Sequence, residues 1–257
     1  MARQAVALRA VACAGDMQAA VREFPPISLP GRQPVSLAVK VAVASGPARR
    51  FVVGDPAFQL IDTLAGQTLA RVAAAEHLAG PGDVVLDEST WSSLSAAGPV
   101  PGCQPDWRVS DGQSFAVLSG LPAFPAVSHA SPVAGLTLPP EVIRPWVIPA
   151  VWDRLQAGLG EFLAELRPAT ALFLNFEGID YDGDEAACQV LDAFIRRVQA
   201  VLSGLEGTFM QLTIGDKGNY FYASFGAPVA HEDDARRALS AALELRSASL
   251  SVGLPPV

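Results

Sequence analysis

The chain has 257 residues, half of them hydrophobic and 17% charged, with a formal net charge of −8. So apolar a composition excludes wholesale disorder, and the length allows one or two domains. The acidic balance, without any run of Lys or Arg, argues against binding to nucleic acid or to an anionic membrane. Three widely spaced cysteines form no CxxC pair, and no uninterrupted apolar run reaches transmembrane length. We therefore expect a cytoplasmic protein with reduced thiols and no membrane partner.

The first third of the chain predicts one helix, two strands and a second helix. Residues 2–23 carry an apolar stripe at helical spacing, and the near-continuous apolar run Val35–Ala44 predicts a buried strand. A second strand is expected at Arg50–Val53. Asp62 then stands where a helix over Thr63–Ala79 would take its N-cap.

The middle of the chain predicts strands followed by a linker. A strand is expected at Asp83–Leu86, and a hairpin at Trp107–Val109 and Ser114–Leu118. Residues 119–168 hold eight prolines and no long strand, so we take them as a linker. Within it, the apolar side chains between Trp152 and Leu166 recur at helical spacing and predict one helix.

The last third contains the clearest periodicity. A buried strand with a following loop is predicted at 169–180, and an amphipathic helix at 187–205. Phe209–Ile214 and Asn219–Phe225 are β-prone runs that flank a Gly-Asp-Lys-Gly turn, which is a hairpin signature. A Gly-Ala-Pro break and an acidic helix start at residues 232–234 follow.

The order of this hairpin, FGAP at 225–228 and HEDDARRAL at 231–239 resembles the class III adenylyl/guanylyl cyclase family. The earlier stretch resembles the second half of such a domain, through ASG at 44–46, VVGD at 52–55 and GPGDVVLDEST at 80–90. Its helix region is most similar to the first, catalytically degenerate domain of soluble adenylyl cyclases, which carry two cyclase domains in tandem.

The resemblance implies an α/β fold of the α+β sandwich type. It implies cyclase-like (ferredoxin-like) half-domains, mainly antiparallel sheets covered by helices. Residues 1–118 would be the C-terminal half of a first domain, 119–168 the linker, and 169–257 the N-terminal half of a second. Two arrangements stay open. In the first, each half needs sequence outside the chain to complete its domain. In the second, the two halves together complete one sheet, as in a circularly permuted domain.

The resemblance also implies where metal ions, Mg or Mn in the parent enzyme, would bind. The family holds them with two carboxylates while ATP is cyclised to cyclic AMP and diphosphate. Asn175 stands at the first of these positions, and a neutral amide is a poor ligand for a divalent ion. The second position is Asp216 when the hairpin is aligned on its Gly-Asp pair, and Asn219 when it is counted back from FGAP.

Candidate nucleotide-binding residues follow from the same comparison. Gln211 lies near the position of the family's base-reading lysine and can hydrogen-bond an adenine edge, while Lys217 is displaced into the turn. Thr63 falls near the base-specificity position. Ala70 and Ala74 replace the Asn and Arg that orient the ribose and stabilise the transition state, so no residue of the segment is expected to be catalytic.

Each of these candidate residues also has a purely structural interpretation. Asp216 is an ordinary turn former, Lys217 a solvated lysine, Thr63 a helix cap, and Asn175 a residue that bonds backbone at a strand end. For function, we expect a degenerate segment of an adenylyl cyclase-like signalling protein; the alternative is a non-catalytic module for pairing or regulation. ATP or a related nucleotide and other cyclase half-domains are the expected partners. An unrelated domain with accidental motif matches is a third reading.

Overall fold

A computed structural model describes residues 2–96, 98–100, 102–119, 121, 137–160, 166–215 and 218–251. The chain forms two compact units. Unit 1 comprises Met1–Ala48 and Gln67–Pro132, and unit 2 comprises Arg49–Gly66 and Val133–Val257. Among the described residues, no helix combines the length and the apolar character needed to cross a bilayer.

Unit 1 contains a four-stranded sheet in the order β1-β4-β6-β5. β1 pairs with β4 in parallel, and the other two pairings are antiparallel. The strands are β1 (Val41–Val43), β4 (Asp83–Asp87), β5 (Asp106–Ser110) and β6 (Gln113–Ser119). The helices are α1 (Ala2–Arg22), α2 (Gln67–Leu78) and α3 (Glu88–Ser95). The predicted N-terminal helix, the strand at Asp83–Leu86 and the β5–β6 hairpin are therefore confirmed.

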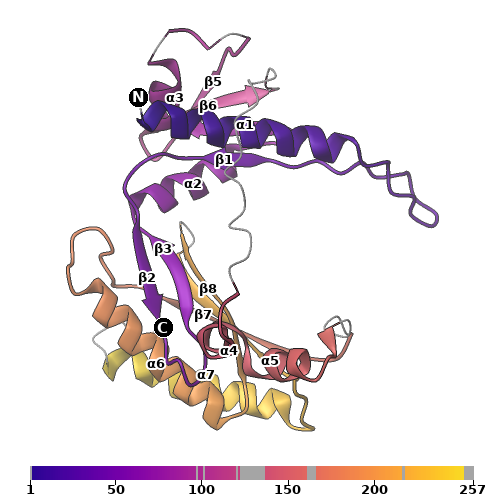
Figure 1. Ribbon diagram of the computed structural model, residues 1–257, viewed down its shortest axis with the longest axis vertical. Coiled ribbons are helices and arrows are strands. Elements are labelled where there is room, and N and C mark those ends of the chain that lie inside the picture. The colour runs from indigo at the N-terminus through magenta and orange to yellow at the C-terminus, as the bar shows by residue number, and fades with distance from the viewer. Residues whose placement is uncertain are drawn as a thin grey trace. The chain divides into compact units, whose positions relative to one another are not determined.

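The helices of unit 1 cover both faces of this sheet because strand alternation gives each face its own apolar side chains. On one face α1 and α3 pack through Val11 and Leu94 against Val84 and Leu118. On the other face Ala75 of α2, and Ala79 just after that helix, pack against Val85, Phe115 and Val117. The sheet is thus the middle of three layers (Figure 1).

The strand predicted at Val35–Ala44 is much shorter, because only Val41–Val43 pairs with β4. The preceding residues form an extended arm beyond the end of α1, in which Ile27 and Val35 make an isolated antiparallel bridge (Figure 1). The apolar character of this run predicted burial, but among the described residues Val35 and Leu37 are left exposed.

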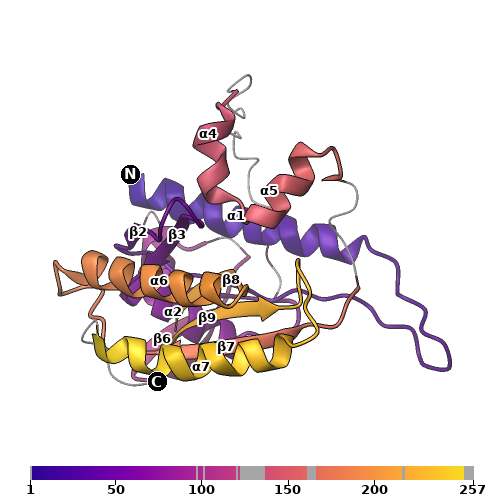
Figure 2. The ribbon, with the colours of Figure 1, turned by 90° about the horizontal axis from the view of Figure 1, so that it is seen from below.

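Unit 2 contains an antiparallel sheet in the order β7-β9-β8. The strands are β7 (Thr170–Phe176), β8 (Thr208–Gly215) and β9 (Gly218–Phe225), and the main helices are α6 (Ala187–Gly204) and α7 (Asp234–Ser251). Figure 2 shows both helices running alongside the strands. The core takes Phe194 and Ile195 from α6, Ala241 and Leu245 from α7, and Leu174, Phe176, Phe221 and Phe225 from the sheet.

A separate sheet of two strands, β2 (Arg49–Val53) and β3 (Ile61–Ala65), also belongs to unit 2. The register pairs Arg49 with Ala65 and Val53 with Ile61. The helix predicted over Thr63–Ala79 is therefore wrong in its first turn: residues 61–65 are a strand and the helix begins at Gln67. Asp62 is not a cap but forms an exposed ion pair with Arg50 across the hairpin, 2.6 Å between Nη2 and Oδ2.

The linker region of the sequence contributes α4 (Pro140–Ile143), a 3₁₀ turn at Arg144–Trp146 and α5 (Pro149–Gln156). The predicted linker helix over 152–166 thus starts earlier, and residues 161–165 lie outside the described part of the chain. The fold as a whole is mixed α/β, with mainly antiparallel sheets packed by helices, as predicted. The compact units nevertheless divide the segment 1–118, because Arg49–Gly66 packs within unit 2.

Candidate functional site

The β2–β3 hairpin is held on unit 2 by a polar contact between its loop and α6. The amide of Gly54 donates to Oδ1 of Asp192 at 2.8 Å, and the amide of Asp55 donates to Oε1 of Gln199 at 2.7 Å. Gln199 in turn donates from Nε2 to the carbonyl of Gln59 at 2.6 Å. Only 3% of Gln199 is exposed, so its amide serves the loop backbone and not solvent.

Glycine is required at one point of this contact. Gly54 has φ +103°, a conformation that strains any residue with a Cβ. A Cβ there would also lie 2.6 Å from the carbonyl oxygen of Gln59 and 2.9 Å from Nε2 of Gln199. The loop backbone can therefore approach α6 only because residue 54 has no side chain.

Apolar contacts complete the docking of the hairpin. Phe51, Val53 and Ala65 are all at most 2% exposed and belong to the core of unit 2. Phe51 meets the ring of Tyr181 edge-on, with 5.8 Å between ring centroids. Burial raises the pKa of the Tyr181 hydroxyl, which has no hydrogen-bond partner among the described residues. β3 lies beside β8, so the hairpin borders the main sheet (Figure 1).

The motif HEDDARRAL forms the start of α7 and anchors it. The amide of His231 donates to Oδ2 of Asp234 at 2.9 Å, which satisfies a backbone donor ahead of the helix. Asp233 accepts hydrogen bonds from Arg236 and Arg237, which lower the pKa of its carboxyl group. Arg237 also reaches Oε2 of Glu206, 2.5 Å away in the α6–β8 connection. In this structure the motif is a helix-capping and tethering device.

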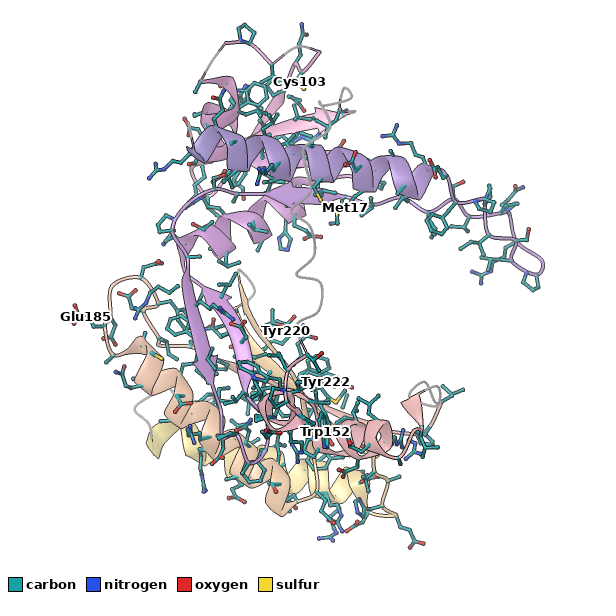
Figure 3. The ribbon with its side chains drawn as sticks, in the orientation of Figure 1. Met17, Cys103, Trp152, Glu185, Tyr220 and Tyr222 are labelled. Atoms are coloured by element: carbon teal, nitrogen blue, oxygen red, sulfur yellow. The ribbon has the colours of Figure 1, made fainter. Side chains whose placement is uncertain are left out.

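The outer face of the β7-β9-β8 sheet, opposite the core, carries an aromatic cluster. Phe173 stacks on Tyr222 with ring centroids 4.8 Å apart, and Tyr220 lies 6.4 Å from Phe173. Figure 3 labels Tyr220 and Tyr222. Phe173 is 65% exposed. The strand register places Gln211 beside Tyr222, and Asn175 beside Tyr220. Apolar rings and polar amides therefore share one exposed surface.

The predicted site residues are distributed unevenly over this arrangement. Gln211 is on the outer face, exposed, and donates to Oγ1 of Thr213 at 3.3 Å. Thr63 is not a helix cap: it lies in β3, opposite Phe51. Asp216 and Lys217 lie outside the described residues. Ala70 is in α2 of unit 1.

Asn175 lies against Gly218, the first residue of β9. Its Nδ2 is 2.7 Å from the point where a Cβ on Gly218 would stand, and Gly218 has φ +88°. Asn219, the alternative second position, donates from Nδ2 to the carbonyl of Phe176 at 3.2 Å. Among the described residues no group of three or more His, Cys, Asp or Glu side chains could hold a metal ion.

The main residues of the hairpin contact with α6, and of the aromatic face of the β7-β9-β8 sheet, were not predicted from the sequence. Gln199 interrupts the apolar pattern of α6 on its buried side, and a buried glutamine in a helix is a signal of a specific partner. Asp192 lies one turn or more before it and is only partly buried. Phe173, Tyr220 and Tyr222 alternate with core residues along β7 and β9. That alternation indicates that one face of the sheet is aromatic and exposed, although a sheet face in contact with water does not need aromatic side chains.

No family model matches the chain. The chain is similar to human adenylate cyclase type 10, with 24% identity over 233 residues. This alignment covers 82% of the chain but 14% of that protein's length. The similarity supports a cyclase-like relationship, and it runs through both units.

Proposed function

We propose that the chain is a segment of a cytoplasmic adenylyl cyclase-like signalling protein, and that this segment pairs cyclase-like halves without catalysing the reaction itself. The observation that carries the proposal is the docked hairpin. Residues 49–66 follow β1 of unit 1 in sequence but belong to unit 2. Their loop is hydrogen-bonded to Asp192 and Gln199, and their apolar side chains contribute to the core of unit 2. A protein whose role is to bring half-domains together needs such a contact.

The absence of catalysis is argued from the residues at the family's positions. Asn175 offers no charge to a metal ion, and Ala70 and Ala74 can neither orient a ribose nor stabilise a transition state. In the parent protein, the conversion of ATP to cyclic AMP with Mg or Mn would use residues outside this segment. That activity is proposed from the similarity to adenylate cyclase type 10, of which the chain spans a small part.

The pairing role is tested by cutting the linker after folding. A protease site is placed in the proline-rich linker of the full chain, and the cleaved protein is passed through a size-exclusion column. We expect the two fragments to stay together because Phe51, Val53 and Ala65 remain buried in unit 2. Phe51→Asp should separate them, whereas Val52→Asp, at an exposed position of the same strand, should not. Separation of the unmodified fragments would contradict the pairing role.

The catalytic state is tested by assaying the full 257-residue chain for cyclic AMP formation from Mn-ATP. We expect no product from it, and turnover by a longer parent chain that contains complete cyclase domains. Turnover by the 257-residue chain would refute the degenerate interpretation. No product from either the 257-residue chain or the longer chain would favour a parent protein with a regulatory role alone.

Nucleotide binding without turnover is a second candidate function, supported by the aromatic outer face beside Gln211. Adenine can stack on exposed rings, and Gln211 can pair with its edge. A titration of Tyr fluorescence with ATP should saturate, and Gln211→Ala should weaken binding several-fold. Gln113→Ala, an exposed glutamine of β6 in unit 1, is the matched control. Equal affinities for the two variants would remove Gln211 from the site.

A further inference from the structure

A cavity of about 270 Å³ lies in unit 2 where three separate stretches of chain meet. The loop of the β2–β3 hairpin forms one wall, the first turn of α5 a second, and the junction of α6 with β8 a third. The side chains that line it include Phe58, Gln59, Pro149, Leu202, Phe209 and Val229. A molecule in this cavity would touch the hairpin, the linker helix and the body of unit 2 together.

The lining is mainly apolar, with polar groups at few points. Ser203 and Thr208 are among the lining residues, and a hydroxyl group can donate or accept a hydrogen bond. Glu206 also lines it, but its carboxylate already contacts Arg237 at 2.5 Å and His231 at 3.3 Å. Because that charge is matched within the protein, the cavity favours a neutral ligand with one polar group.

The volume sets the size of the ligand. A dry cavity of about 150 Å³ holds benzene, and sites for drug-sized molecules begin at about 300 Å³. The cavity of 270 Å³ therefore suits one aromatic ring with a small substituent. Phe58 and Phe209 both line the cavity, and contacts between aromatic rings are favourable beyond their buried area.

We propose that this cavity binds a small neutral ligand with a single aromatic ring and one hydrogen-bonding group, and that its occupancy strengthens the docking of the β2–β3 hairpin. The regulatory half of this proposal rests on the proposed pairing function. Gln59 connects ligand binding with hairpin docking, because it lines the cavity and its carbonyl accepts the hydrogen bond from Gln199. A ligand that binds only the docked hairpin shifts the docking equilibrium by mass action.

Phenol is the probe for the site itself. Methyl signals of Leu202 and Val229 in the full chain are followed by NMR during a phenol titration, and we expect saturable shifts. Ala150→Trp, which fills the cavity from α5, should weaken binding at least tenfold, and Phe58→Ala should weaken it several-fold. Ala200→Trp, at an exposed position of α6 outside the lining, should leave it unchanged. No saturation, or equal affinity in Ala150→Trp and Ala200→Trp, would overturn the site.

Hydrogen exchange tests the link to the hairpin. The amides of Gly54 and Asp55 are protected only while the loop contacts Asp192 and Gln199. At a phenol concentration ten times its Kd, their protection should rise about tenfold. Saturable binding without this rise would refute the regulatory half alone. Unprotected amides in the absence of phenol would instead refute hairpin docking, and with it the proposed pairing function.

Discussion

Replacing Gln199 by alanine tests the hairpin contact most directly. Gln199→Ala removes the acceptor of the Asp55 amide and the donor to the Gln59 carbonyl, which are bonds of 2.7 and 2.6 Å. Each such bond contributes about 0.5–1.5 kcal/mol, and a buried group left unpaired costs about 1–3 kcal/mol. Because the site is almost fully buried, we expect the free energy of unfolding of unit 2 to fall by about 2–4 kcal/mol.

The measurement is urea unfolding followed by tyrosine fluorescence, together with hydrogen exchange at Asp55. Gln189→Ala, an exposed glutamine of the same helix, is the control, and should change stability by no more than about 0.5 kcal/mol. Protection of the Asp55 amide should fall in Gln199→Ala and stay unchanged in Gln189→Ala. Equal stability of the two variants with unchanged Asp55 exchange would refute the assignment of Gln199 as the residue that holds the loop.

Three further predictions concern single side chains in either unit. Gly54→Ala should destabilise unit 2 by at least about 1–2 kcal/mol in urea unfolding because of its positive φ, whereas Gly204→Ala, with open space around its Cβ, should not destabilise it. Asp87→Ala breaks the ion pair with Arg71 in unit 1, where the Asp87 side chain is 2% exposed, and should cost about 3–5 kcal/mol; Asp106→Ala, in an exposed pair with Arg108, should cost less than about 1 kcal/mol. Hydrogen bonds from Arg237 and Arg236 lower the pKa of Asp233, so its stabilising contribution is present above the unfolded pKa of about 3.9 and is lost as the pH falls through the folded value. Asp233→Asn should therefore lose stability at pH 7 and show a shallower decline below pH 4; an unchanged acid profile would contradict this role.

The elements with strong periodicity were predictable, and those decided by distant partners were not. The apolar stripe of α6 and the two β-prone runs that pair as β8 and β9 could be recognised from local sequence. Residues 61–65 carry no such local information: Asp62 and Thr63 suit a helix start, but pairing with residues 49–53 makes them a strand. Val35–Ala44 shows the reverse case, in which an apolar run lacks a partner strand over most of its length.

The candidate site was predictable only in part for the same reason. The resemblance identified Asn175 and Gln211, which the sheet brings to one face. It could not identify Asp192 and Gln199, because their role depends on a loop more than 130 residues earlier in the chain, with separations of 138 and 144 residues. Such long-range contacts leave no spacing pattern in the sequence.

The placement of Arg49–Gly66 means that the chain passes between the two units three times, after Ala48, after Gly66 and after Pro132. A gene cut at the linker alone would therefore not yield two independent modules. The downstream product would lack Phe51, Val53 and Ala65 from its core, and the upstream product would carry those side chains without cover. Unit 2 cannot complete its core until the β2–β3 hairpin has packed against it. A substitution at Phe51, in the first part of the sequence, would therefore destabilise the unit formed mainly by the last part.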